Sequence, residues 1–200
     1  FFAVPRHPMD SYYHLRVKKQ GSLGSATILY LLFFIIFMIY QTGKGFIYQY
    51  KAVVDMDINA LVIGFFTILI LFILCNYLVT SIKDGDGSLK QVYMIPAYGL
   101  LPVMVSMIAV IALSYILTYN ESFLLTLILY IGITWSAISI LLGFLVVHDY
   151  TMKELISSIL ITVIFMIIVA VVALIILIMW EQLWQFLVTF VEEMKRNVFS

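Results

Sequence analysis

Three groups of polar residues in this chain have types and spacings that could support chemistry. In the first group, His7, Asp10 and His14 fall at i, i+3 and i+7 on one face of a helix and offer ligands that zinc or iron accepts. Such a site needs a further strong ligand, yet the only other histidine is the distant His148. We therefore expect these histidines to pack or to form hydrogen bonds, and we predict no metal site.

The second group lies in KDGDGS, where Asp84, Asp86 and Ser88 alternate as in a calcium-binding loop. The EF-hand pattern then demands glycine at its sixth position and glutamate at its twelfth, where this chain has Leu89 and Ile95. The calcium hypothesis fails. We interpret KDGDG as a solvated turn whose glycines permit tight backbone angles.

The third group is the adjacent pair His148 and Asp149, which follows an apolar run. The chain has no G-x-S-x-G, no H-E-x-x-H and no phosphate loop ending in Gly-Lys-Ser/Thr. A pair of this kind is typical of a helix end, so we predict no catalytic residue and no cofactor. A membrane enzyme remains an alternative only if this pair reaches a lipid headgroup.

The elements that carry these residues must lie in a membrane. The 200 residues are 64% hydrophobic and 11% charged, and the mean hydropathy of +1.11 is far from that of a soluble domain. A bilayer core about 30 Å thick needs about 20 apolar residues per helix. Segments 24–41, 58–82, 89–118, 122–147 and 155–180 meet this requirement. We predict an all-α integral membrane protein with five transmembrane helices, in contact with lipid and without a nucleic-acid partner.

Lysine and arginine residues indicate the orientation, because they favour cytoplasmic segments. With a cytoplasmic N-terminus, seven of the eleven basic residues lie inside and four lie outside. The inner ones are Arg6, Arg16, Lys18, Lys19, Lys83, Lys90 and Lys153. We therefore predict a cytoplasmic N-terminus and a C-terminus on the outer side.

Two capping boxes mark where helices begin. Ser88 with Gln91, and Thr151 with Glu154, place a hydroxyl and a longer acceptor three residues apart, which satisfies free backbone N–H groups at a helix start. Each pattern precedes an apolar segment, so we expect the third and fifth spans to start there. The short stretch TYNES at 118–122 is a minimal turn, which makes the third and fourth spans antiparallel neighbours.

The third span should be kinked by proline. Pro96 and Pro102 lack an N–H, and each frees a backbone carbonyl that then needs a partner from outside the helix. Tyr93 and Tyr98 flank the kink. We predict that any function of this region lies at Tyr93, Pro96, Tyr98 and Pro102 and not at the aspartates.

The fourth span carries small residues at intervals of four, three and four: Gly132, Ser136, Ser139 and Gly143. Such a face lets another helix approach closely. We interpret it as a helix-packing face, and not as a substrate path, and we expect a partner protein to use it.

We predict an amphipathic helix at each end of the chain. Residues 1–22 place aromatic and basic side chains on one side, which suits a short helix on the cytoplasmic surface before the membrane domain at 23–180. Residues 181–200 continue a stripe with Trp180, Trp184, Leu187 and Phe190. This stripe favours an interfacial anchor, with a docking surface for another membrane protein as the alternative.

The order of these motifs resembles the Yip1 family in its bacterial branch. The motifs are HPMDSYYHLRVKK, five spans, GSLKQVYMIPAYGLLP and a small-residue fourth span, and together they cover nearly the whole chain. The resemblance implies a five-helix membrane domain with a cytoplasmic N-terminus in a bacterial plasma membrane. Eukaryotic relatives bind Rab GTPases, but the acidic, proline-rich and Tyr-Gly motifs associated with them are not clear here, so that role is not carried over.

Some bacterial relatives look like companions of sugar ABC transporters. The resemblance therefore implies a non-enzymatic accessory or scaffold subunit beside another membrane protein, such as ABC permease subunits. The alternative is a permease-like transport subunit on the path of a neutral solute, because no charged residue lies in the central part of a span. This alternative has a partial similarity to the coupling loop of ABC-importer permeases, in Lys83, Asp84 and Gly85 followed by Ile95 and Pro96.

Overall fold

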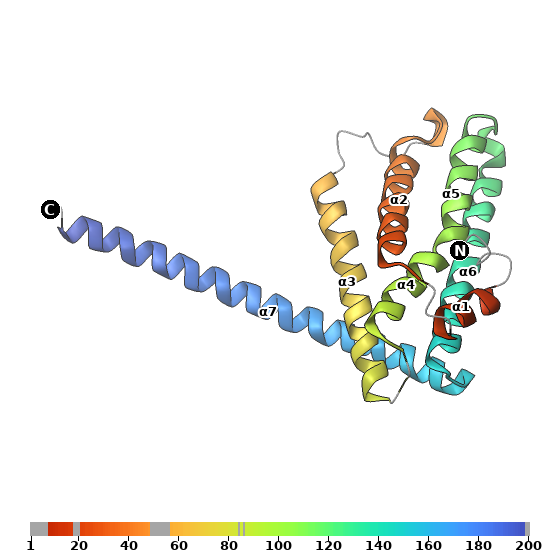
Figure 1. Cartoon of the computed structure of the whole chain (residues 1–200). Coiled ribbons are helices and arrows are strands. Elements are labelled where there is room, and N and C mark those ends of the chain that lie inside the picture. The colour runs from red at the N-terminus through yellow and green to blue at the C-terminus, as the bar shows by residue number, and fades with distance from the viewer. Residues whose placement is uncertain (1–7, 18–20, 49–56, 84, 86, 199–200) are drawn as a thin grey trace.

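The computed structural model describes residues 8–17, 21–48, 57–83, 85 and 87–198. These residues form helices and the turns between them (Figure 1). The helices are α1 (Pro8–Val17), α2 (Leu23–Thr42), α3 (Ile58–Ile82), α4 (Leu89–Gly99), α5 (Leu101–Ser114), α6 (Ser122–His148) and α7 (Met152–Val198), with short 3₁₀ turns η1 (Phe46–Tyr48) and η3 (Tyr119–Glu121).

Five apolar helical stretches are long enough to cross a membrane, which confirms the predicted fold. They are Leu23–Thr42, Ile58–Ile82, Leu89–Ser114, Tyr119–His148 and Met152–Met194. The third stretch, made of α4 and α5, is the core of the bundle. Of its most apolar window 67% is buried, against at most 22% in any other stretch.

Capping boxes start α4 and α7 at the predicted positions. The Ser88 N–H donates to Gln91 Oε1 at 2.9 Å, and the Gln91 N–H donates back to Ser88 Oγ. The Thr151 N–H donates to Glu154 Oε2 at 2.7 Å, and the reciprocal bond is also formed. Both spans therefore begin where local side chains replace the missing helical acceptors.

The turn between α5 and α6 contains a third capping box, which was not predicted from the sequence. The Thr118 N–H and hydroxyl both donate to Glu121 Oε2 at 3.0 Å. The box stabilises η3 and leads directly into α6. As predicted, α5 and α6 pack as antiparallel neighbours.

The N-terminal helix α1 begins at Pro8, which suits proline because the first turn of a helix has no use for its missing N–H. The helix packs against α6 and α4, and it buries Tyr12 and Leu15 to 1% and 2% exposure. Met9 and Tyr13 stay exposed. The predicted surface helix is thus also part of the protein core.

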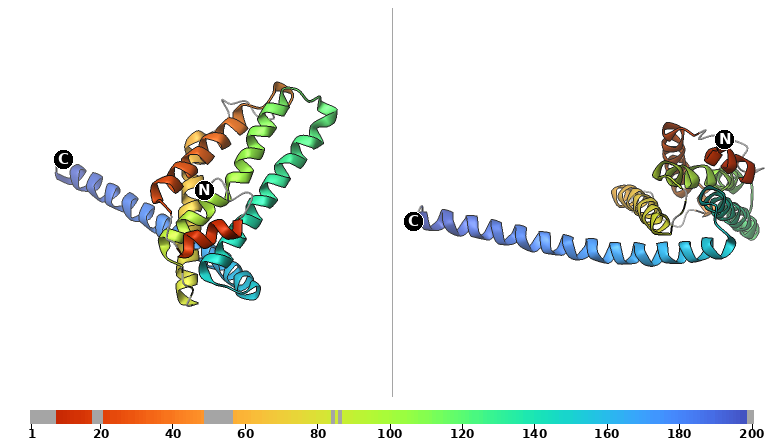
Figure 2. Two further views of the ribbon diagram at one scale, coloured as in Figure 1. Left: turned by 45° about the vertical axis from the view of Figure 1, so that its right-hand side comes forward. Right: turned by 60° about the horizontal axis from the view of Figure 1, so that its bottom comes forward.

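The last helix, α7, is one continuous element of 47 residues. At 1.5 Å per residue it is about 70 Å long, more than twice the thickness of a bilayer core. Residues 181–198 are helical, as expected, but they continue the fifth span without a break. Only the first turns of α7 pack on the bundle, and the rest extends away from it in every view (Figures 1 and 2).

Candidate functional site

The third span breaks at Leu100, between α4 and α5. Pro96 lies inside α4, which continues beyond it to Gly99. Pro102 lies in the first turn of α5, where a proline is tolerated because the N–H groups there have no helical acceptor. The predicted kink is confirmed, and its break lies between the two prolines.

Hydroxyl groups from other helices bond to the backbone of α4. The Tyr12 hydroxyl of α1 donates to the Ile95 carbonyl at 3.2 Å, and the Tyr30 hydroxyl of α2 donates to the Tyr93 carbonyl at 2.8 Å. The two bonded carbonyls lie within the turn from Val92 to Pro96, although the carbonyl that Pro96 itself frees is that of Val92. Two tyrosines from different helices therefore stabilise the same distorted segment.

A side chain of α6 satisfies the backbone on the other side of the break. The Val103 N–H lies in the first turn of α5 and donates to the Ser136 hydroxyl oxygen at 2.9 Å in a buried position. A serine on the predicted packing face therefore replaces the acceptor that a continuous helix would have supplied. The two features that the sequence singled out, the kink and the small-residue face, meet at this bond.

The small-residue face of α6 is filled by helices of the same chain. A Cβ on Gly143 would lie 2.6 Å from Ile95 Cγ2 and 2.9 Å from Tyr12 Cζ, and one on Gly132 would collide with Ser106 of α5. Gly132, Ser136, Ser139 and Gly143 are all buried. The expectation that a partner protein would use this face is wrong, because α1, α4 and α5 already cover it.

Tyr93 and Tyr98 join α4 to α2. The Tyr98 and Ser25 hydroxyls are 2.8 Å apart, and the Tyr93 and Thr27 hydroxyls are 2.9 Å apart. Sequence reasoning did not identify Ser25 or Thr27, and the only local signal is their polarity at the start of an apolar span. The two tyrosines thus connect α4 to α2 by hydrogen bonds at the kink.

His148 and Asp149 bond to different partners. The His148 Nδ1–H donates to the Phe144 carbonyl at 3.0 Å, and its ring stacks on Tyr150 with centroids 5.3 Å apart. Asp149 ends α6 in the left-handed conformation, with φ of 58°, and forms an ion pair with Arg16 at 2.7 Å. The Arg16 guanidinium holds the pKa of the Asp149 carboxyl below its usual range. The pair serves as a helix end and as an attachment point for α1.

Gly85 and Gly87 allow the turn after α3 to lie on aromatic rings. A Cβ on Gly85 would lie 2.5 Å from the Tyr150 hydroxyl oxygen, and one on Gly87 would lie 2.6 Å from His148 Cδ2. No described glycine has a positive φ, so the predicted reason, tight backbone angles, is wrong. These glycines are needed for close approach.

The residues that were considered as metal ligands, and rejected, are only partly within the described residues. His7 lies outside them, as do Asp84 and Asp86 of the turn. Asp10 and His14 are exposed on α1. In the part of the chain that the structure describes, no group of three histidine, cysteine or acidic side chains could hold a metal ion.

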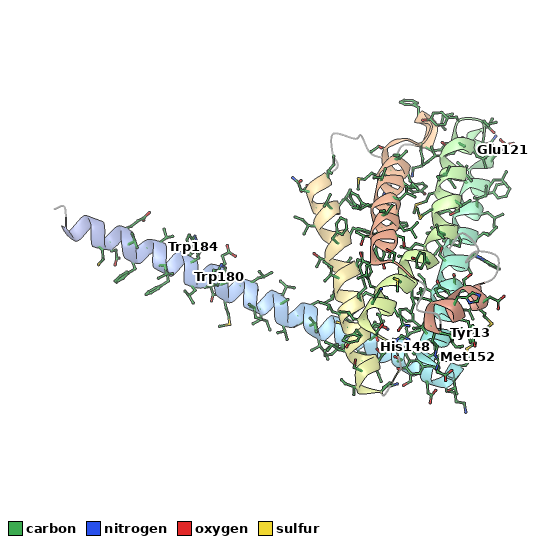
Figure 3. All side chains as sticks on the ribbon, viewed as in Figure 1. Tyr13, Glu121, His148, Met152, Trp180 and Trp184 are labelled. Atoms are coloured by element: carbon green, nitrogen blue, oxygen red, sulfur yellow. The ribbon has the colours of Figure 1, made fainter. Side chains whose placement is uncertain are left out.

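The aromatic stripe of α7 is exposed. Figure 3 places Trp180 and Trp184 on the part of α7 that has left the bundle, far from His148 and Met152. Leu187 and Phe190 of the same stripe are exposed too. From residue 170 to residue 194, every side chain of α7 is exposed.

A comparison with models of protein families matches residues 2–180 to the Yip1 domain. No curated protein and no solved structure matches the chain. The match includes α1, the first four spans and α7 as far as Trp180, so the last 18 described residues of α7 lie beyond it. The chain, with five apolar helices around a broken third span, therefore belongs to the Yip1 family of multi-pass membrane proteins.

Proposed function

We propose that this protein is a non-enzymatic accessory or scaffold subunit that packs against another membrane protein through α7. The observation that carries the proposal is the exposure of α7. Its buried side chains are Leu155, Ser158 and Thr162, all within its first three turns. Among the residues that the structure describes, no other helix lies beside the rest of this apolar fifth span.

The attachment of α7 to the bundle supports this proposal. Asn76 of α3 donates to the Thr162 hydroxyl at 3.4 Å, and the Lys83 ammonium donates to the Ser157 hydroxyl at 2.7 Å. These bonds hold the start of α7 against α3, while the remaining length points away from the bundle (Figure 1). A helix held at one end presents its whole circumference to a neighbouring protein.

The residues proposed for the contact are the exposed aliphatic side chains of residues 163–179, with the stripe Trp180, Trp184, Leu187 and Phe190 at the far end. Tryptophan and phenylalanine are frequent anchors of protein contacts. Tryptophans also favour the membrane surface, so Trp180 and Trp184 mark where α7 leaves the hydrocarbon.

The proposed location and class of partner rest on the resemblance to the bacterial branch of the family. We propose a bacterial plasma membrane. The cytoplasmic N-terminus and the outer C-terminus are proposed because seven of the eleven basic residues then lie in inner segments. The partner class that fits the bacterial branch is the permease part of a sugar ABC transporter.

Copurification after gentle solubilisation tests the proposal. Recovery of an ABC permease with its ATPase would support an accessory role. A truncated chain ending after Trp180 and a chain with Trp184 and Phe190 replaced by alanine should recover less of the permease. Flux of a neutral solute through vesicles that hold the purified chain alone would support the transport alternative and overturn the accessory role.

A further inference from the structure

A groove opens on the lipid side of the bundle between α2, α3 and α4. It has a volume of about 640 Å³, within the range of sites that hold a small organic ligand. Leu23 and Thr27 of α2, Ile70 and Leu74 of α3, and Lys90 and Tyr93 of α4 line it. Leu23, Ile70 and Leu74 are each about half exposed, so the groove is open to the surroundings of the bundle.

Aromatic side chains join α2 and α3 beyond one end of the groove. Phe33 of α2 stacks on Phe65 of α3 with ring centroids 5.6 Å apart, and Phe34 meets Phe66 at 5.7 Å. These contacts join α2 and α3 one to two turns beyond Thr27 and Ile70. The groove lies between this aromatic contact and the start of α4, where Leu89 and Lys90 line it.

The walls of the groove suit a hydrocarbon chain. Aliphatic side chains supply most of the lining, and the Thr27 and Tyr93 hydroxyls are bonded to each other at 2.9 Å. The two hydroxyl groups of the wall therefore already have a hydrogen-bond partner, and a ligand needs no polar group in the deep part of the groove. An apolar groove at membrane depth is filled by the medium that surrounds it, which is lipid.

The open end of the groove carries a positive charge. Lys90 is the only charged residue of the lining, it is exposed, and no described acidic side chain pairs with it. It lies in the first turn of α4, where the helix dipole adds a partial positive charge. A second groove, between α5 and α6 and lined in part by Pro102 and Trp135, has no charged residue.

We infer that this groove is a binding site for one anionic phospholipid, with an acyl chain along Ile70 and Leu74 and the phosphate at Lys90. A phosphate supplies the negative charge that both Lys90 and the start of α4 attract. The site does not depend on the proposed function, because α7 packs on a different face of α3 through Asn76 and Lys83.

Native mass spectrometry of the full chain in detergent tests the site, with phosphatidylglycerol and phosphatidylcholine of identical acyl chains as probes. The charge test compares Lys90→Gln with Lys153→Gln. Lys153 is exposed and is also the second residue of a helix after a capping box, but it lines no described groove. The test of acyl-chain binding compares Leu74→Trp, which fills the groove, with Leu78→Trp. Both leucines are 47% exposed, but only Leu74 lines the groove.

Lys90→Gln should weaken phosphatidylglycerol binding about fivefold and leave phosphatidylcholine binding unchanged, whereas Lys153→Gln should change neither. Leu74→Trp should weaken the binding of both lipids, whereas Leu78→Trp should change the binding of neither lipid. Equal losses from the two lysine variants, or unchanged binding in Leu74→Trp, would show a general lipid shell without a site and would overturn the inference.

Discussion

The Val103 N–H and the Ser136 hydroxyl oxygen are 2.9 Å apart, and this buried bond ties the break in the third span to the middle of the fourth. It explains how a helix that is interrupted at membrane depth avoids an unpaired backbone group. The same face of α6 then accepts Ile95 and Tyr12 beside Gly143. One helix thus supports both halves of the broken span.

Replacing Ser136 by alanine should lower the free energy of unfolding by about 1–3 kcal/mol, because it leaves the Val103 N–H buried without an acceptor. Unfolding by a denaturing detergent measures this loss. Thr134→Ala is the control, since Thr134 is exposed on the same helix. Equal stability of the two variants would contradict the role of this bond.

Replacing Gly143 by alanine should destabilise the protein by about 1–3 kcal/mol, because the new methyl group collides with Ile95 and Tyr12. Gly64→Ala is a matched control in α3, where a Cβ meets nothing within 4 Å. That control should be neutral or stabilising by up to about 1 kcal/mol. A smaller loss for Gly143→Ala than for Gly64→Ala would refute the close packing of α6.

Replacing Tyr12 by alanine should detach α1, because Tyr12 is buried to 1% exposure and donates to the Ile95 carbonyl. Trypsin should then cleave after Arg16 at least several times faster than in the parent protein. Tyr13→Ala, at a side chain that is 54% exposed, should leave the cleavage rate unchanged. The cleavage rate of Tyr12→Phe should fall between those of the two alanine variants, since this variant loses the hydrogen bond but keeps the ring.

The ion pair between Arg16 and Asp149 should make the docking of α1 depend on pH. Because Arg16 lowers the pKa of Asp149 in the folded protein, the pair stabilises docking above the ordinary carboxyl pKa of about 3.9, and this contribution is lost as the pH falls further. Hydrogen exchange of α1 amides should show slightly more protection in the parent than in Asp149→Asn at neutral pH. The difference should vanish in acid; a difference that grows in acid would contradict the assignment.

Features set by neighbouring residues could be predicted from the sequence. Each of these features affects the backbone within a few residues of its own position. They are the apolar runs, the capping boxes at Ser88 and Thr151 and the prolines of the third span. The contacts of Tyr12 and Ser25 could not be predicted, because their partners lie 83 and 73 residues away. The same limit applies to α7, whose apolar sequence predicts a span but does not say which helices lie beside it.

Photocrosslinking in native membranes tests the central claim about α7 most directly. A photoreactive residue at Ile176, which is 60% exposed on α7, is compared with one at Ile68, which is 63% exposed on α3. The proposed function predicts a covalent product between Ile176 and another multi-pass membrane protein, and only lipid products from Ile68. Lipid products alone from both positions, or a product of Ile176 only with a second copy of this chain, would contradict it.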